Sequence, residues 1–249
     1  MALIVNINDD FVKQIVFCIS SAVTDDIMQD TRRANMNRNT MNSYSFRIWD
    51  LINRNVYNTF KNDSNIVVGF TKRGVWNMTP IFDKSTGLIF TLMREERFLE
   101  VKRNRKNHQH YVYELARAFN ADIEIQQQSL FELERCDEKI QKNIRRICND
   151  LLISTEMVKR HAIVLFSSQD GLLNSVRCCM INCNFEECET VTWNEYIGVA
   201  ESVVVEQITN DNPKQNNPTM GLQYTPKAKK KKQLNIDITT MDKNIIEAK

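Results

Sequence analysis

The spacing of apolar residues along the chain predicts three amphipathic helices. Each of three segments repeats apolar side chains every three or four positions, which places them on one face of a helix. Asn8 or Asp9 precedes the first segment as a suitable N-cap, and Ser43 or Ser45 precedes the second. The predicted buried stripes are Phe11, Ile15, Cys18, Ile19 and Ala22; Trp49, Ile52, Val56 and Phe60; and Ile140, Ile144, Ile147 and Leu151.

The pattern changes to short β-rich runs in the middle of the chain. Residues 65–71, 75–82 and 87–93 are rich in β-branched and aromatic side chains, and the turn-like sequences "KRG" and "DKSTG" separate them. This arrangement predicts an antiparallel three-strand meander. Pro80 has no N–H to donate to a ladder, so its strand is predicted to be bulged or at an edge.

A second β unit is predicted over residues 160–183. The Asp-Gly pair at 170–171 is a strong signal for a two-residue hairpin turn between two apolar runs. A regular pairing from this turn places Ile163 opposite Cys178 and turns the adjacent Cys179 to the other face. The two neighbouring thiols are therefore expected to diverge.

Together these patterns predict an α+β fold, in which antiparallel β units, a three-strand meander and a hairpin, pack with amphipathic helices. Residues 24–44 are polar and aperiodic, which predicts an exposed connection, and residues 193–208 predict a helix or a helix followed by a strand. Three of the four prolines lie beyond residue 210. We expect a globular domain over residues 1–209 and a flexible, lysine-rich tail over residues 210–249.

Composition narrows the class of protein. The 249 residues are 42% hydrophobic, which is enough for a substantial core, and 33 basic against 31 acidic residues leave a net charge of only +2. Seven irregularly spaced cysteines without a preceding signal sequence predict reduced thiols in a cytoplasmic protein. Residues 11–23 carry Lys13 and are shorter than a bilayer span of about 20 residues, so we expect a buried helix and not a membrane anchor.

Local clustering of basic residues points to nucleic acid. The sequence "MREERFLEVKRNRK", residues 93–106, predicts a strand end running into a helix whose second half is basic, and a nearby tryptophan offers a stacking surface. The alternative is a solvated helix face with cations near the helix C-terminus. A lysine run in the tail is either an electrostatic arm or a solubilising segment. The candidate nucleic-acid contacts are Lys72, Arg73, Trp76, Arg97, Lys102, Arg103, Arg105, Lys106, Lys229, Lys230, Lys231 and Lys232.

A second class of site, a metal-dependent nuclease, is weighed against these contacts. It would use Asp83, Glu95, Glu96 and Lys102 with Mg²⁺ or Mn²⁺. Carboxylates in surface turns are far commoner than such sites. The chain has no "GxxxxGK[ST]", "GxGxxG", "HExxH" or "GxSxG" motif, which disfavours the standard nucleotide-fold enzymes.

No metal or cofactor is expected otherwise. His108 and His110 lie two residues apart in a segment that Tyr111, Leu115 and Phe119 predict to be helical. Residues two apart on a helix do not share a face, so the pair is not expected to chelate a metal.

Three segments resemble a known group of proteins. They are "FRIWDLINRNV", "KRGVWNMTPIFDKSTGLIFTLMREERF" and "HYVYELARAFN", and they resemble uncharacterised proteins of low-GC Gram-positive bacteria, their plasmids and prophages. The resemblance covers most of residues 40–205. It brings no catalytic residue, but the mobile-element setting implies a phage-resistance protein of the abortive-infection kind.

Three functions follow as hypotheses. The first is a non-enzymatic nucleic-acid-binding protein that prefers single-stranded RNA or DNA and acts in phage defence. The second is the metal-dependent nuclease. The third is a protein-interaction or antitoxin-like subunit without catalysis, whose ligand is another protein. The sequence favours the first.

Overall fold

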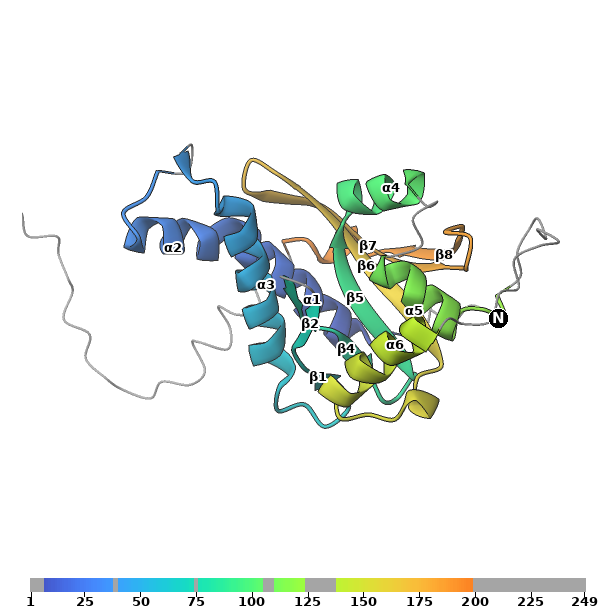
Figure 1. Ribbon diagram of the computed structural model, residues 1–249. Coiled ribbons are helices and arrows are strands. Elements are labelled where there is room, and N and C mark those ends of the chain that lie inside the picture. The colour runs from blue at the N-terminus through green and yellow to red at the C-terminus, as the bar shows by residue number, and fades with distance from the viewer. Residues whose placement is uncertain (1–6, 38–39, 74–75, 105–109, 124–137, 199–249) are drawn as a thin grey trace, which may run out of the picture. The chain divides into compact units, whose positions relative to one another are not determined.

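The computed structural model describes residues 7–37, 40–73, 76–104, 110–123 and 138–198 (Figure 1). Several sequence predictions fall outside these ranges. They concern Arg105, Lys106, His108 and the tail over residues 210–249 with its lysine run.

The described residues form an α+β fold, which is the fold class that the sequence predicts. Its elements lie in three layers. One six-stranded sheet has the strand order β1-β4-β5-β6-β7-β8, and strands β2 and β3 form a separate two-stranded sheet. Helices cover both faces of the large sheet (Figure 1). The strands are β1 (Ile66–Val68), β2 (Thr71–Arg73), β3 (Trp76–Met78), β4 (Ile81–Asp83), β5 (Leu88–Arg94), β6 (Arg160–Gln169), β7 (Leu172–Ile181) and β8 (Glu187–Thr192).

Helices α1 (Asp9–Ser21) and α3 (Tyr44–Phe60) pack on one face of the sheet. Asn8 caps α1 because its side-chain oxygen accepts hydrogen bonds from the backbone N–H groups of Asp10 and Phe11, which confirms one of the two predicted caps. Every residue of the predicted stripe of α1 is buried. On α3 the stripe is buried except for Trp49, which is half-buried.

Helices α4 (Glu95–Arg103), α5 (Tyr111–Phe119) and α6 (Glu138–Asp150) cover the opposite face. The four residues predicted as the buried stripe around α6 are all buried, and they pack against α5 and strands β4 and β5. The alternation of side chains along β5 and β6 explains the two cores: Phe90 and Val164 face α1 and α3, whereas Ile89 and Ile163 face α4 to α6.

The predicted three-strand meander is only partly right. Strands β1, β4 and β5 pair antiparallel in that order, but the β2–β3 hairpin is inserted between β1 and β4 and belongs to the second sheet. The runs 65–71 and 75–82 therefore each divide into two short strands. The second run breaks at Thr79 and Pro80, since proline cannot donate a ladder hydrogen bond.

The two predicted β units are not separate. Strand β5 pairs with β6 in parallel over its whole length, from Leu88 opposite Arg160 to Arg94 opposite Phe166. The chain between them contains α4, α5 and α6, which supplies the long crossover that a parallel pair requires. The expectation of purely antiparallel units was wrong at this one pairing, which joins them into one mixed sheet.

The predicted hairpin is present, but its predicted register is wrong by one residue. Asp170 and Gly171 form the turn with positive φ angles of 54° and 82°. A bulge between Ser167 and Ser168 then shifts the pairing, so that Ile163 lies opposite Cys179 and not Cys178. The two cysteines still diverge, because Cys178 belongs to the core under α1 and Cys179 to the core under α4 and α5.

Residues 24–33 are helical, whereas the sequence predicted an exposed or partly ordered connection; apart from Ile27, their side chains are exposed or half-buried. A π-helix (Ala22–Asp26) continues α1 and leads into α2 (Ile27–Arg33). The segment has few apolar residues, and polar contacts with α3 help to hold it in place. Asp26 accepts hydrogen bonds from Arg54 and Asn55, at 3.0 and 2.7 Å. At the other end of the fold, the expected helix after Trp193 is only a short 3₁₀ turn (Asn194–Tyr196) as far as residue 198.

No described helix combines the length and the apolar character needed to cross a bilayer.

Candidate functional site

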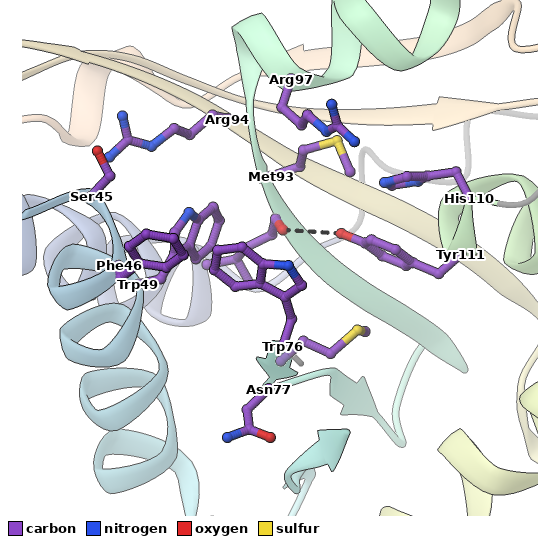
Figure 2. A pocket seen from close by; sticks show the side chains of 12 residues that line it. Ser45, Phe46, Trp49, Trp76, Asn77, Met93, Arg94, Arg97, His110 and Tyr111 are labelled. Carbon is purple, nitrogen blue, oxygen red and sulfur yellow. Dashed lines mark hydrogen bonds between the residues drawn. The ribbon is translucent and has the colours of Figure 1, made fainter. Parts of the chain in front are cut away.

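A gap beside the end of β5 opens into a cavity that described residues line. Strand β4 pairs only with the first half of β5, Leu88 to Phe90, so the second half has β6 along one edge and no described strand along the other. Tyr111 at the start of α5 reaches this free edge, where its hydroxyl donates a hydrogen bond to the carbonyl oxygen of Leu92 at 3.4 Å (Figure 2).

The resulting pocket has a volume of about 560 Å³. Helix α3, the β2–β3 hairpin, the end of β5, the first turn of α4 and the start of α5 each contribute side chains to its wall. The lining residues are Ser45, Phe46, Trp49, Trp76, Asn77, Met78, Leu92, Met93, Arg94, Arg97, His110 and Tyr111 (Figure 2).

Aromatic rings dominate one side of the pocket. Phe46 and Trp76 stack with their centroids 4.8 Å apart and their planes 14° apart, although the residues remain 51% and 49% exposed. Trp49 lies deeper and packs edge-on against Phe166 at 5.6 Å. Flat, exposed and mutually supported rings are the surfaces on which unpaired bases stack.

The charge of the pocket lining is positive. It contains Arg94 and Arg97 and no carboxylate. Arg97 also pairs with Glu100 at 2.5 Å on the exposed side of α4. Arg94 has no ion pair with any described residue; its guanidinium lies over the ring of Phe166 at 6.0 Å, and its Nε is buried without a hydrogen-bond partner among the described residues. The pocket therefore offers an anion a cation that no described carboxylate neutralises.

A smaller cavity of about 30 Å³ adjoins the pocket and shares Trp49, Asn77, Met78, Leu92 and Tyr111 with it. Thr79 also lines this cavity. Its residue is only 4% exposed, and its hydroxyl has no hydrogen-bond partner in the part of the chain that is described. An unsatisfied buried hydroxyl is unusual, so this one is available to a water molecule or to a polar group of a ligand.

An ion-pair network holds α4 against the sheet and thereby positions Arg97. Arg177 on β7 donates hydrogen bonds to both carboxylate oxygens of Glu95, at 3.0 and 2.6 Å, and one to Glu187 at 2.7 Å; Lys102 also binds Glu187, at 3.1 Å. Hydrogen bonding to Glu95 above all raises the pKa of Arg177. Burial alone would raise the pKa of Glu187, but the hydrogen bonds from Arg177 and Lys102 outweigh it and lower that pKa.

The residues proposed for a metal-dependent nuclease do not come together. Asp83 lies at the start of the β4–β5 turn, where its carboxylate accepts hydrogen bonds from Ser85 and Thr86. Glu95 lies beyond the other end of β5, about 20 Å away for a strand of this length, and its carboxylate is occupied by Arg177. Glu96 is exposed. Within the described ranges, no three His, Cys, Asp or Glu side chains are grouped as metal ligands.

The predicted nucleic-acid contacts divide into three groups. Trp76 and Arg97 meet in the pocket, which is the one juxtaposition that the sequence anticipates. Lys72 and Arg103 are exposed outside it, and Lys102 serves the network above. Arg73 pairs with Trp76 through the β2–β3 ladder. The remaining candidates, Arg105, Lys106 and Lys229 to Lys232, lie outside the described residues.

Other pocket residues are not anticipated by the sequence. Phe46 lies outside the apolar stripe of α3, so its ring is exposed and is not part of the core. An aromatic residue outside the stripe of an amphipathic helix is the signal by which this residue could have been found. His110 caps α5, with its Nδ1 accepting a hydrogen bond from the N–H of Val112 at 3.4 Å, so it is not part of a two-residue helical pair.

Four of the described cysteines are buried as neutral thiols. Cys18, Cys148, Cys178 and Cys179 are buried, and burial raises their pKa values, to about 11 for the first two and about 12 for Cys179. Neutral thiols of this kind behave as small apolar side chains.

The fold and pocket define an α+β protein with an aromatic, positively charged ligand pocket. The chain belongs to a protein family of unknown function, DUF5986, whose model matches residues 5–241. This confirms the expected membership in an uncharacterised family. Comparison with curated proteins gave no match. Comparison with solved structures gave none either.

Proposed function

We propose that this protein binds single-stranded nucleic acid and that the pocket beside β5 is its principal contact. Basic residues beyond the pocket, Lys72, Arg103 and the predicted lysine tail, supply electrostatic contacts that do not depend on sequence.

The observation that carries the proposal is the combination, in one cavity, of stacked, exposed rings with two arginines, of which Arg94 has no ion pair with any described residue. Phe46 and Trp76 offer a flat surface to a base, and Arg94 and Arg97 offer positive charge to a phosphate. Proteins that bind single strands combine these two elements, because every base has a stacking face and every nucleotide a negative charge. A duplex hides the faces of its bases, so it is not the preferred ligand.

The biological setting is a further part of the proposal. The resemblance to proteins of bacterial plasmids and prophages supports a role in phage defence of the abortive-infection kind. Expression in a phage-sensitive bacterial host tests it: the efficiency of plating should fall by at least tenfold with the intact protein and recover with Trp76→Ala. Equal plating with and without the protein would remove this part of the proposal and leave the binding function in place.

The binding function is tested by fluorescence anisotropy with labelled single-stranded RNA and DNA across a series of salt concentrations. Affinity for the intact protein should fall steeply as salt rises. Trp76→Ala should weaken binding by about 1–3 kcal/mol with an unchanged salt dependence, because it removes a stacking contact and no charge.

Phe70→Ala is the matched control. Phe70 is also an exposed aromatic, at 52%, but it packs on Tyr57 outside the pocket, so its removal should leave affinity unchanged. An intact protein without salt-sensitive binding at low ionic strength contradicts the proposal. Cleavage of the labelled strand in Mg²⁺ or Mn²⁺ would instead favour the nuclease. If the protein neither binds nor cleaves the strand, the protein-interaction subunit is favoured.

A further inference from the structure

We infer that the pocket takes one unpaired nucleotide at a time, with its base on Trp76 and its phosphate on Arg94 and Arg97, and that a free nucleoside monophosphate occupies the same site. This inference rests on the proposed function and specifies the ligand of the same pocket.

The size of the pocket supports a single nucleotide. Its volume of about 560 Å³ lies within the range of about 300 to 1,000 Å³ that is typical of sites for small molecules. Five elements line it and it is open to solvent on one side, so a strand that runs across the surface can turn one nucleotide inward to fill it. Extended single-strand grooves, in contrast, hold several stacked bases along an open channel.

The charge of the pocket requires an anionic ligand. The lining holds two arginines and no carboxylate. The buried Nε of Arg94 has no partner among the described residues, and its guanidinium lies over the ring of Phe166, 6.0 Å from the ring centroid. A guanidinium that is fixed in this way presents a planar set of donors, which suits a phosphate group. A cationic ligand is disfavoured, although aromatic walls alone would accept one.

The polar end of the pocket fits the edge of a base. The adjoining cavity of about 30 Å³ is too small for a ring but large enough for one exocyclic group or a water molecule. The buried hydroxyl of Thr79 lines it and has no partner in the described part of the chain. A base that stacks on Trp76 and points an exocyclic oxygen or amino group at Thr79 satisfies this hydroxyl.

A nucleotide fits better than a phosphotyrosine peptide, the other ligand with a ring and a phosphate. The stacking surface continues outside the pocket, because both members of the Phe46–Trp76 pair are about half exposed. A second base of the same strand can stack there, whereas a peptide has one phosphotyrosine ring and a backbone that needs hydrogen-bonding partners.

Calorimetric titration of the full chain with AMP, adenosine, inorganic phosphate and phosphotyrosine tests the inference. AMP should bind, and should displace a labelled single-stranded oligonucleotide in the anisotropy assay. Adenosine should bind at least tenfold more weakly than AMP, because it lacks the group that the arginines hold. Arg94→Gln should weaken AMP by at least tenfold and leave adenosine unchanged, while Trp76→Ala should weaken both.

Three further variants and a folding measurement separate loss of binding from loss of the fold. Because Arg94 also packs on Phe166, thermal unfolding is recorded for each variant, and Arg97→Gln at a more exposed position gives a second measure of the phosphate contact. Arg145→Gln, exposed on α6 and outside the pocket, should leave AMP binding unchanged. Thr79→Val should reduce the differences in affinity among AMP, CMP, GMP and UMP, because it removes the hydroxyl that contacts the edge of the base.

The failures of the two proposals are distinguishable. Strong oligonucleotide binding without displacement by millimolar AMP overturns the single-nucleotide pocket and leaves the proposed function intact. AMP binding without any oligonucleotide binding supports the pocket and overturns the proposed function. Phosphotyrosine that binds more tightly than AMP overturns the choice of ligand.

Discussion

The indole of Trp76 on β3 lies face to face with the phenyl ring of Phe46 on α3, although the two residues are 30 positions apart in the sequence. Each ring covers one face of the other and leaves about half of its residue exposed. The pair therefore forms a preorganised stacking surface, since neither ring has to lose its orientational freedom when a ligand binds.

The first prediction concerns the coupling of these two rings. Phe46→Ala should weaken binding to a single strand less than Trp76→Ala, because it removes the support of the stacking ring and not the ring itself. The double variant should lose less binding free energy than the two single variants lose in sum. A double-mutant cycle measured by anisotropy should give a coupling energy of about 1 kcal/mol. Fully additive losses would show that the two rings contact the ligand independently.

The second prediction concerns the basic residues that follow the pocket. Reversing Arg103, Arg105 and Lys106 to Glu should weaken binding to single strands of every sequence and flatten the log-log salt dependence by about 0.7 per lost phosphate contact. Deleting residues 226–249 should have the same kind of effect, independently of the first change. Reversing Arg145 and Arg146, exposed on α6, is the control and should change the slope less. If the intact protein, the Arg103, Arg105 and Lys106 variant and the control variant all have the same slope, the basic cluster is a solvated surface and not a contact with nucleic acid.

The third prediction concerns acid stability. His161 is completely buried, with Nε2 hydrogen-bonded to Thr91 at 2.9 Å, and burial lowers its pKa from 6.5 to about 3. The unfolded chain therefore binds a proton at this residue before the folded chain does, so stability is fully present above about pH 6.5 and falls as the pH decreases toward 3. Between pH 8 and pH 5 this residue alone should remove about 2 kcal/mol of unfolding free energy.

Urea denaturation of the protein and of His161→Leu at both pH values measures this effect. The variant leaves the hydroxyl of Thr91 without its partner, so it should be less stable at pH 8. Its loss between pH 8 and pH 5 should nevertheless be smaller by about 2 kcal/mol. An identical pH dependence in both proteins would contradict the assignment of the effect to His161.

The fourth prediction concerns the attachment of α5 to the sheet. Asn120, directly after α5, is 0% exposed; its Nδ2 donates hydrogen bonds to the carbonyls of His161 and Ile181, at 2.9 and 2.8 Å, and its Oδ1 accepts one from the N–H of His161 at 3.0 Å. Asn120→Ala leaves these three backbone groups without their partner and should cost about 3 kcal/mol of unfolding free energy. Asn58→Ala on the exposed surface of α3 should cost less than about 0.5 kcal/mol in the same denaturation experiment.

The fifth prediction concerns the network under α4. Arg177→Met keeps the apolar stem but leaves Glu95 and Glu187 without their guanidinium partner, at side chains only 23% and 28% exposed. The expected cost is about 2 kcal/mol, below the value for a fully buried pair because water still reaches these groups. Arg97→Met breaks a pair that is more than half exposed and should cost less than about 0.5 kcal/mol. Similar losses for both variants would show that the network does not stabilise α4.

Local rules in the sequence were sufficient for the helices and for the hairpin turn. The apolar stripe of α1, its Asn8 cap and the stripe of α6 follow from a period of 3.6 residues and from the need to satisfy N–H groups at a helix start. The turn at Asp170 and Gly171 follows because these residues adopt positive φ angles at little cost. The helix over residues 27–33 escaped prediction because contacts with α3 stabilise it more than its own apolar pattern does.

The site was predictable only in part. Trp76 and Arg97 could be chosen from the sequence, because aromatic and basic residues together are typical of contacts with single strands. Arg94 belongs to the same basic stretch, residues 93–106, but nothing in the sequence joins these residues with Phe46, since stacking acts across space and not along the chain. The proposed nuclease set illustrates the converse: Asp83 and Glu95 are close in sequence but lie at opposite ends of one strand.

The sequence by itself therefore determined where the strongly amphipathic helices lie, where the chain turns at residues 170–171 and that the class is α+β, because each of these depends on interactions within a few residues. Only the tertiary structure decided that β5 pairs in parallel with β6, that a bulge shifts the β6–β7 register, and that the short β4 leaves the edge at Leu92 open to form a pocket. These features depend on how the strands satisfy one another's backbone hydrogen bonds and bury one another's side chains, which no local pattern specifies.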